Sequence, residues 1–244
     1  METTTKLGKN RTGMDMSPLD RGEMLQGSER TVPTSEGDEG TAAGLRAEYI
    51  RESDALGSVP PPGTVKGLVQ SGMQALTGNR PQVLIDKLGE RLAFERGGTR
   101  LYEAVIAKCL ATSDGQGVID MGQLEQIHRD EAQHFQLVRS AIESLGADPT
   151  AQTPCADLTG VQSLGLIQAV TDPRTTVLQS LQTALIAELA DNAGWELLID
   201  LAQAAGQTQL AEQFGAAFAE EQRHLEQVRS WVQQLTIAEA KLLS

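Results

Sequence analysis

Apolar residues recur along this chain at spacings of three and four positions, beginning near Pro81. Residues at these spacings lie on one face of a helix, so each such series predicts a helix with one buried side. Each series also carries a glutamate close to its middle. The series are Leu88, Leu92, Glu95, Thr99, Tyr102, Ile106 and Cys109; Leu124, Ile127, Glu131, His134, Val138, Ile142 and Leu145; Leu181, Ala184, Glu188, Asn192, Trp195 and Leu198; and Leu210, Phe214, Ala217, Glu221, His224, Val228, Trp231 and Leu235.

Helix boundaries between these series follow from proline, glycine and aspartate. Pro81 suits a first helical position, and Asp120 is a candidate N-cap. Gly146 and Gly206 interrupt the pattern. The connection after Gly146 is long and has a short expected helix at 161–171. Two short links around one long link predict an all-α fold, an antiparallel four-helix bundle with one long crossover.

The first 80 residues follow a different pattern. The segments TVPTSEGDEG and GSVPPPG are rich in glycine and proline, which continue neither helices nor strands. We expect a largely disordered extension over 1–80, disordered to about residue 41 and carrying short helices afterwards, in AAGLRAEYIRESD and from Thr64. Residues 81–244 are expected to form the bundle.

Composition narrows the function. Residues 81–244 hold 22 of the 33 acidic residues and 11 of the 20 basic ones, which argues against nucleic acid as a partner. No apolar run approaches the ~20 residues that span a bilayer, so no membrane partner is expected. The N-terminus has no apolar segment typical of a secretory signal. Two cysteines make no disulfide framework, so a cytoplasmic location is expected.

One pattern of carboxylate and imidazole residues occurs twice in residues 81–244. Each copy has a glutamate seven residues before an aromatic residue and, in the next helix, an E-x-x-H pair. The copies indicate an internal duplication of 81–146 and 174–240, whose halves are expected to contribute equally. The candidate metal ligands are Glu95, Glu131 and His134 in the first copy and Glu188, Glu221 and His224 in the second.

This pattern indicates a metal site because of where the side chains lie. Glu and His at positions i and i+3 are neighbours on one side of a helix. A single E-x-x-H is a weak signal, but two of the three histidines have it and both lie on a predicted buried face. Four buried carboxylates need neutralising, and two divalent cations supply that charge. Without metal, the pKa values of all four glutamates are expected to be raised.

The motifs resemble those of the ferritin-like di-iron carboxylate superfamily. DEAQH and EEQRH look like the paired motifs of stearoyl-carrier-protein desaturases and ribonucleotide reductase small subunits, and FERGGTRLY looks like the first helix of rubrerythrin. Dimanganese catalases share the ligand order. Bacterial ferritin-like domain proteins also resemble the chain, which lacks rubrerythrin's C-x-x-C pairs and ferritin's short fifth helix. The resemblance implies that Glu131 and Glu221 bridge two metals, with Glu95, His134, Glu188 and His224 as terminal ligands.

Other polar residues and two glycines lie close to these motifs. The Tyr102 hydroxyl, the one candidate catalytic group, is expected to bond a carboxylate from a facing helix. Asp130 and Glu220 either accept hydrogen bonds from the ligand histidines or are ordinary surface acids. Gly97 and Gly98 leave room for an oxidant or let a neighbouring helix approach.

The expected function is therefore that of a non-haem di-metal protein reacting with dioxygen or hydrogen peroxide. A di-iron oxidoreductase of ferroxidase or peroxidase type comes first, with two iron ions and an external electron donor. The alternatives are a dimanganese catalase, with two manganese ions, and a non-catalytic ferritin-like metal-binding module. The assembly state stays open, with a homodimer among the candidates.

Overall fold

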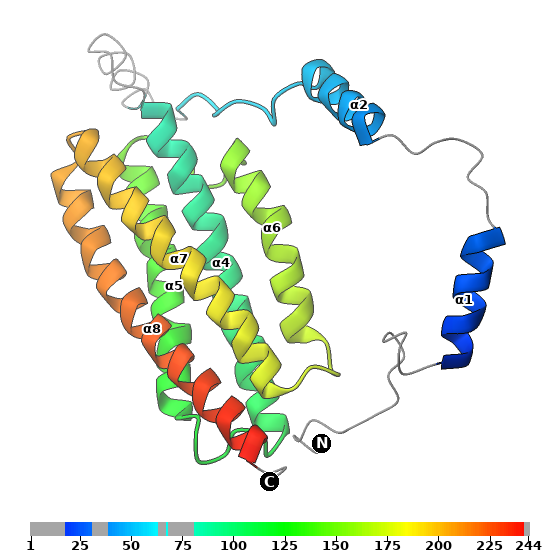
Figure 1. The fold of residues 1–244 in the computed structure, drawn as a ribbon. Helices are drawn as coiled ribbons and strands as arrows, with labels where there is room; N and C mark the ends of the chain where they lie inside the picture. Colours follow the sequence, from blue (N-terminus) through cyan, green and yellow to red (C-terminus); the bar gives the residue numbers. More distant parts are fainter. Residues whose placement is uncertain (1–17, 31–38, 63–66, 68–80, 242–244) are drawn as a thin grey trace. The chain divides into compact units, whose positions relative to one another are not determined.

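The computed structural model describes residues 18–30, 39–62, 67 and 81–241, and all regular secondary structure in these ranges is helical (Figure 1). The prediction of an all-α chain is therefore confirmed for the described residues. The helices are α1 (Pro18–Arg30), α2 (Glu39–Glu52), α4 (Pro81–Ala111), α5 (Met121–Ser144), α6 (Pro154–Thr171), α7 (Val177–Ala204) and α8 (Thr208–Lys241).

Helices α1 and α2 belong to a different compact unit from α4–α8. The second was expected from its sequence, whereas α1 forms in a stretch that was expected to be disordered. Its sequence, PLDRGEMLQGSER, begins with proline and contains good helix formers such as Glu, Met, Leu and Arg. Large apolar side chains on both helices are exposed, among them Leu19 and Ile50. The helix expected from Thr64 lies outside the described residues, apart from Gly67.

Side-chain caps fix where α5 and α7 begin. Asp120 accepts hydrogen bonds from the backbone N–H groups of Gly122 and Gln123, at 2.8 and 3.2 Å, as predicted for an N-cap. Thr176 and Gln179 form a reciprocal capping box at the start of α7. Each cap satisfies N–H groups that the first helical turn leaves without a partner.

The glycines predicted to end α5 and α7 have a left-handed conformation. Gly146 has φ +79° and Gly206 has φ +71°, a region in which a side chain would strain the backbone. In contrast, α4 continues through Gly97 and Gly98 without a break. The helix has 31 residues in all. It does not break at the two glycines because packing against neighbouring helices outweighs their low helix propensity.

Helix α6 is longer than the short helix expected within the crossover. It begins at Pro154, with Thr153 as its N-cap, so the local start signal lies well before residue 161. It packs against α4 and α7 (Figure 1). The crossover between α5 and α7 is thus a packed helix, although Gly160 and Gly165 lie within it.

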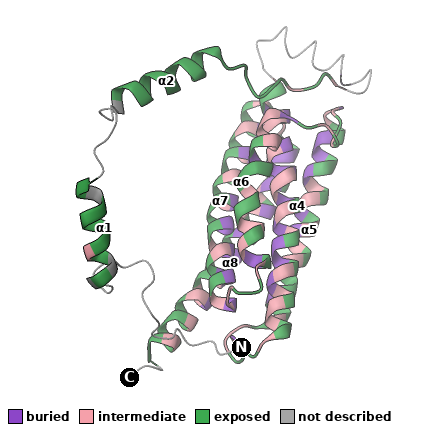
Figure 2. Cartoon of the chain, turned by 90° about the vertical axis from the view of Figure 1, so that its right-hand side faces the viewer, coloured by how far each residue is buried: buried purple, intermediate pink, exposed green. Residues whose placement is uncertain are grey.

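The other four long helices contact one another in a closed ring. Contacts join α4 to α5, α5 to α8, α8 to α7 and α7 to α4. Buried residues line the inner faces of these helices, and exposed residues lie on their outer faces (Figure 2). Short links join α4 to α5 and α7 to α8, as the sequence predicted.

Two apolar cores occupy the interior, one on each side of a polar layer. One core includes Leu88 of α4 and Phe214 of α8; the other includes Val105 of α4 and Trp231 of α8. Along α4 and α8 the chain passes from the first core to the second, and along α5 and α7 it passes in the opposite direction. Sequence neighbours in the ring are therefore antiparallel. The layer between the cores holds the predicted metal ligands.

Candidate metal centre

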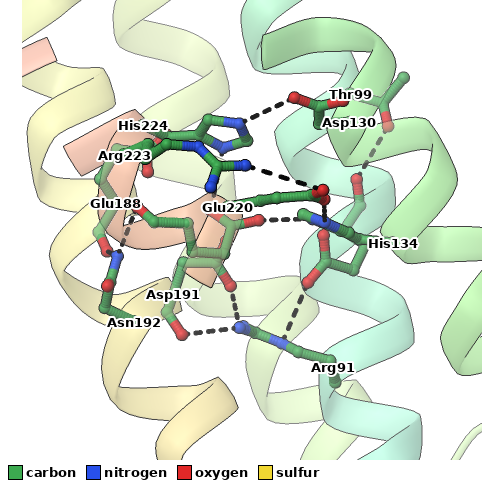
Figure 3. Close-up of polar contacts among 12 residues, drawn as sticks. Arg91, Thr99, Asp130, His134, Glu188, Asp191, Asn192, Glu220, Arg223 and His224 are labelled. Carbon is green, nitrogen blue, oxygen red and sulfur yellow. Dashed lines mark hydrogen bonds and ion pairs between the residues drawn. The ribbon is translucent and has the colours of Figure 1, made fainter. Parts of the chain in front are cut away.

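All six predicted ligands meet in the polar layer, and each is at most 5% exposed. The glutamates and histidines come from all four helices of the ring (Figure 3). The helical spacing explains this, because each ligand replaces an apolar residue without leaving the buried face of its helix. Helix α4 supplies Glu95, α5 supplies Glu131 and His134, α7 supplies Glu188, and α8 supplies Glu221 and His224.

Their ligand atoms form three overlapping groups, in each of which the atoms lie within 4.8 Å of one another. The first group is Glu131, Glu188, Glu221 and His224, and the second is Glu95, His134 and Glu221. The third joins Glu95 and Glu131 to Asp191, which the sequence did not suggest. Glu221 belongs to the first two groups, and Glu131 to the first and the third.

Both ring nitrogens of each histidine face an acid. His134 Nδ1 lies 2.5 Å from Glu221 Oε1, and His224 Nδ1 lies 3.2 Å from Glu221 Oε2. Each Nε2 faces an acid on the other E-x-x-H helix: His134 faces Glu220 at 3.0 Å, and His224 faces Asp130 at 3.1 Å (Figure 3). Asp130 and Glu220 are thus histidine partners, which the sequence left open. Each of these acids holds its histidine ring so that Nδ1 points at the centre of the cluster.

Glu188 is held by two polar neighbours. The Tyr102 hydroxyl donates to Glu188 Oε1 across the α4–α7 contact, as expected for a carboxylate on a facing helix. Asn192 Nδ2 donates to the backbone oxygens of Glu188 and Glu221, at 2.9 and 3.1 Å. These contacts fix α7 and α8 at the level of the site.

A buried arginine also reaches the cluster, and the sequence analysis missed it. Arg91 is 4% exposed, and its Nε lies 3.4 Å from Glu95 Oε1. Its Nη1 donates to the Asp191 side chain and, at 3.0 Å, to the Asp191 backbone oxygen. Two signals pointed to these residues: Arg91 lies four positions before Glu95, and Asp191 three positions after Glu188.

The two glycines of α4 have different surroundings. A Cβ on Gly98 would lie 2.1 Å from Glu131 Oε2, so this glycine lets the carboxylate approach the α4 backbone. A Cβ on Gly97 would meet its nearest atom at 3.9 Å, in the Ser163 side chain. Gly98 therefore serves the close packing of α5, and nothing comparable requires glycine at Gly97.

Other charged and histidine residues of these helices do not join the centre. Glu103 and Glu196 are exposed. His128 is half-buried on α5 and belongs to none of the ligand groups found among the described residues. Exposed Arg139 pairs with Glu143 along α5, at 3.1 Å.

Burial, together with neighbouring charges, raises the pKa of three of the four glutamates. Burial raises the pKa of Glu95 to about 7. The charge of Arg91 lowers this pKa, and the charge of Glu221 raises it. Burial and the Glu221 charge raise that of Glu188 to about 8. Burial, followed by the charges of Glu221 and Glu95, raises the pKa of Glu131 well above its ordinary value. Near pH 7 and without metal, Glu188 is therefore mostly protonated and Glu95 is about half protonated.

Glu221 behaves in the opposite way, so the expectation of four raised values was wrong. Burial alone would raise its pKa, but hydrogen bonds from His134 and His224 lower it to about 2. Burial lowers and the Glu221 contact raises the pKa of His134, which reaches about 9, and the pKa of His224 is raised in the same way. Repulsion among the glutamates alone would have raised all four values, and the two imidazoles reverse the shift at Glu221.

The donor set fits two metal ions. Among the described residues, both oxygens of Glu95, Glu131 Oε2 and Glu188 Oε2 are buried without a hydrogen bond. Carboxylate oxygens buried without hydrogen bonds are costly, and a cation among them removes that cost. Carboxylate oxygen with imidazole nitrogen suits iron or manganese.

The family models, the curated proteins and the solved structures gave no match to this chain. Among the described residues, no helix has both the length and the apolar character needed to cross a membrane. The function is therefore argued from the carboxylate and histidine cluster.

Proposed function

We propose that this chain is a di-metal carboxylate protein of the ferritin-like type, holding two iron ions that react with dioxygen or hydrogen peroxide. The observation that carries the proposal is the convergence of four buried glutamates and two histidines, with several oxygens lacking any hydrogen bond. A buried cluster of carboxylates is costly unless its charge is neutralised, and bound cations neutralise it.

The arrangement of the helices supports the same proposal. The ring of α4, α5, α8 and α7 has antiparallel sequence neighbours, and its long crossover joins α5 to α7. This is the connectivity of ferritin-like bundles, which supply one Glu from each of two helices and an E-x-x-H from each of the others. Helix α6 is an addition to that plan.

Each residue has a distinct role in the proposed centre. Glu221, which faces both histidines, would be shared between two metal ions, and Glu131 approaches from the neighbouring helix α5, beside Gly98. Glu95 and His134 complete one position, and Glu188 with His224 completes the other. Two ferrous ions bound there supply two electrons, the number that reduces peroxide to water or dioxygen to peroxide.

The surrounding residues control protons and water. Asp130 and Glu220 accept from the histidine Nε2–H groups and so keep each Nδ1 available as a ligand atom. Tyr102 keeps its proton because burial raises its pKa well above its ordinary value, and it holds Glu188 by donating to Oε1. The two apolar cores exclude water from both ends of the layer.

The proposal is tested with metal-free protein, prepared by treatment with a chelator. This protein is loaded with ferrous iron under anaerobic conditions, and air or hydrogen peroxide is then added. We expect rapid formation of ferric iron with repeated turnover, and His224→Ala should abolish it. Release of oxygen from peroxide by manganese-loaded protein would point to a catalase. Tight metal binding without either reaction would leave a metal-binding module, and failure to retain metal would refute the proposal.

A further inference from the structure

The surroundings of the two metal positions differ, although the ligands are duplicated. Beside Glu188 stands the neutral hydroxyl of Tyr102. Beside Glu95 stands the guanidinium of Arg91, 3.4 Å away. In the duplication Arg91 corresponds to Ala184, which is fully buried and carries no charge. One half of the centre therefore contains a permanent cation that the other half lacks.

Arg91 is fixed in place, so it cannot simply move away when a metal arrives. Asp191 holds its Nη1 through both a carboxylate oxygen and a backbone oxygen. Its guanidinium carbon lies 4.4 Å from the ring centre of Phe94 and 5.8 Å from that of Trp195. A Cβ on Gly194 would lie 2.9 Å from Nη1, so glycine leaves room for the group. A guanidinium stays charged in proteins.

The donor groups on the two sides also differ. Glu188 and His224 belong to one group of four residues, whereas Glu95 belongs to two groups of three, one with His134 and Glu221 and one with Glu131 and Asp191. Glu95 must also divide its negative charge between a metal ion and Arg91. The Asp191 carboxylate binds Arg91 and offsets part of the arginine charge, and one of its oxygens lies within 4.8 Å of a Glu95 oxygen.

We propose that Arg91 makes the Glu95–His134 position the weaker of the two, so that the first metal ion occupies the Glu188–His224 position. This inference rests on the proposed di-metal function and adds an order of filling to it. Arg91 acts as a positioning residue through Glu95, and Asp191 sets how much of its charge reaches the centre. The halves of the duplication are then unequal in affinity.

The test is an anaerobic titration of chelated protein with Co²⁺, followed by calorimetry and by the visible absorption of the ion. Unaltered protein should bind two ions in two steps that differ by about tenfold or more in Kd. His134→Ala should keep the tighter step, and His224→Ala should lose it. The opposite assignment, or two equal steps, would overturn the inference.

Two further variants change the Arg91 charge in opposite directions. Arg91→Leu with Asp191→Leu removes the cation without leaving an unpaired acid, and should bring the two steps to within about threefold in Kd. Asp191→Asn leaves Arg91 without its counter-charge, and should weaken only the second step, by about tenfold. Arg96→Leu removes an exposed arginine from the same helix and serves as the control, with no change expected.

The outcomes separate the inference from the proposed function. Failure of the unaltered protein to bind Co²⁺ would overturn both. Binding of two ions with a separation that neither the Arg91 double variant nor Asp191→Asn changes would overturn the role of Arg91 alone. Far-ultraviolet circular dichroism of each variant checks that it is folded. If the double variant does not fold, Asp191→Asn still decides the question.

Discussion

Removing the metal should make the stability of the protein fall as pH rises from about 5 to 9. Glu188 has its pKa raised from 4.5 to about 8, and Glu95 from 4.5 to about 7. A raised pKa means that the folded chain holds the proton more tightly than the unfolded chain. The stabilisation is complete below pH 4.5 and is lost as pH rises through the folded value.

The magnitude follows from the size of these shifts. Each pKa unit is worth 1.36 kcal/mol, so Glu188 alone accounts for on the order of 4 kcal/mol across this range and Glu95 for on the order of 3 kcal/mol. His134, raised to about 9, changes in the same direction above pH 6.5. A domain of this kind has about 5–15 kcal/mol in total, so the loss should be easily measured.

The assay is urea unfolding of chelated protein across this pH range, followed by far-ultraviolet circular dichroism. Glu188→Gln keeps an acceptor for Tyr102 but cannot ionise. The free energy of unfolding of this variant should therefore fall by about 4 kcal/mol less, between about pH 5 and 9, than that of the unaltered protein. Glu103→Gln, at an exposed position of α4, is the control and should follow the unaltered protein. A flat profile, or a Gln variant destabilised equally at every pH, would show that the Glu188 pKa is not raised in the folded chain.

Three further perturbations test single contacts. His224→Ala should lower the retained metal below two ions per chain, whereas His128→Ala should not. Equal metal content in the two variants would show that the interpretation of E-x-x-H as a ligand pair is wrong. Gly98→Ala places a methyl group against the Glu131 carboxylate of α5 and should weaken metal binding. Gly97→Ala should be neutral or stabilise by up to about 1 kcal/mol, and thermal unfolding with metal analysis separates the two. Tyr102→Phe removes the donor to the α7 carboxylate and should lower the unfolding free energy by about 1–3 kcal/mol, with an unchanged value in urea contradicting this.

Local signals in the sequence predicted most of the fold. The Asp120 cap and the glycines at 146 and 206 set helix ends, because caps and left-handed turns depend on a few adjacent residues. The start of α6 had an equally local signal in Thr153 and Pro154. The expectation was of a short helix at 161–171 only, and packing on α4 stabilises the longer helix.

The convergence of the six candidate residues was also predictable, because the helical period places i and i+3 residues together and repeats them in both halves. The Arg91–Asp191 pair was not predicted, since it joins residues 100 positions apart and depends on Gly194 leaving space. The lowered pKa of Glu221 has the same origin. It depends on two histidines from different helices meeting one carboxylate, which helix faces alone do not reveal.

The measurement that tests the two-metal centre most directly is the iron content of chelated protein reloaded anaerobically with ferrous iron and freed of excess metal. Our account predicts two ions per chain, and loss of both when Glu131 and Glu221 are replaced together by Gln. Retention of less than about one ion per chain by the unaltered protein would contradict it. So would the same iron content in the double variant, because the metal would then lie outside the buried carboxylate cluster.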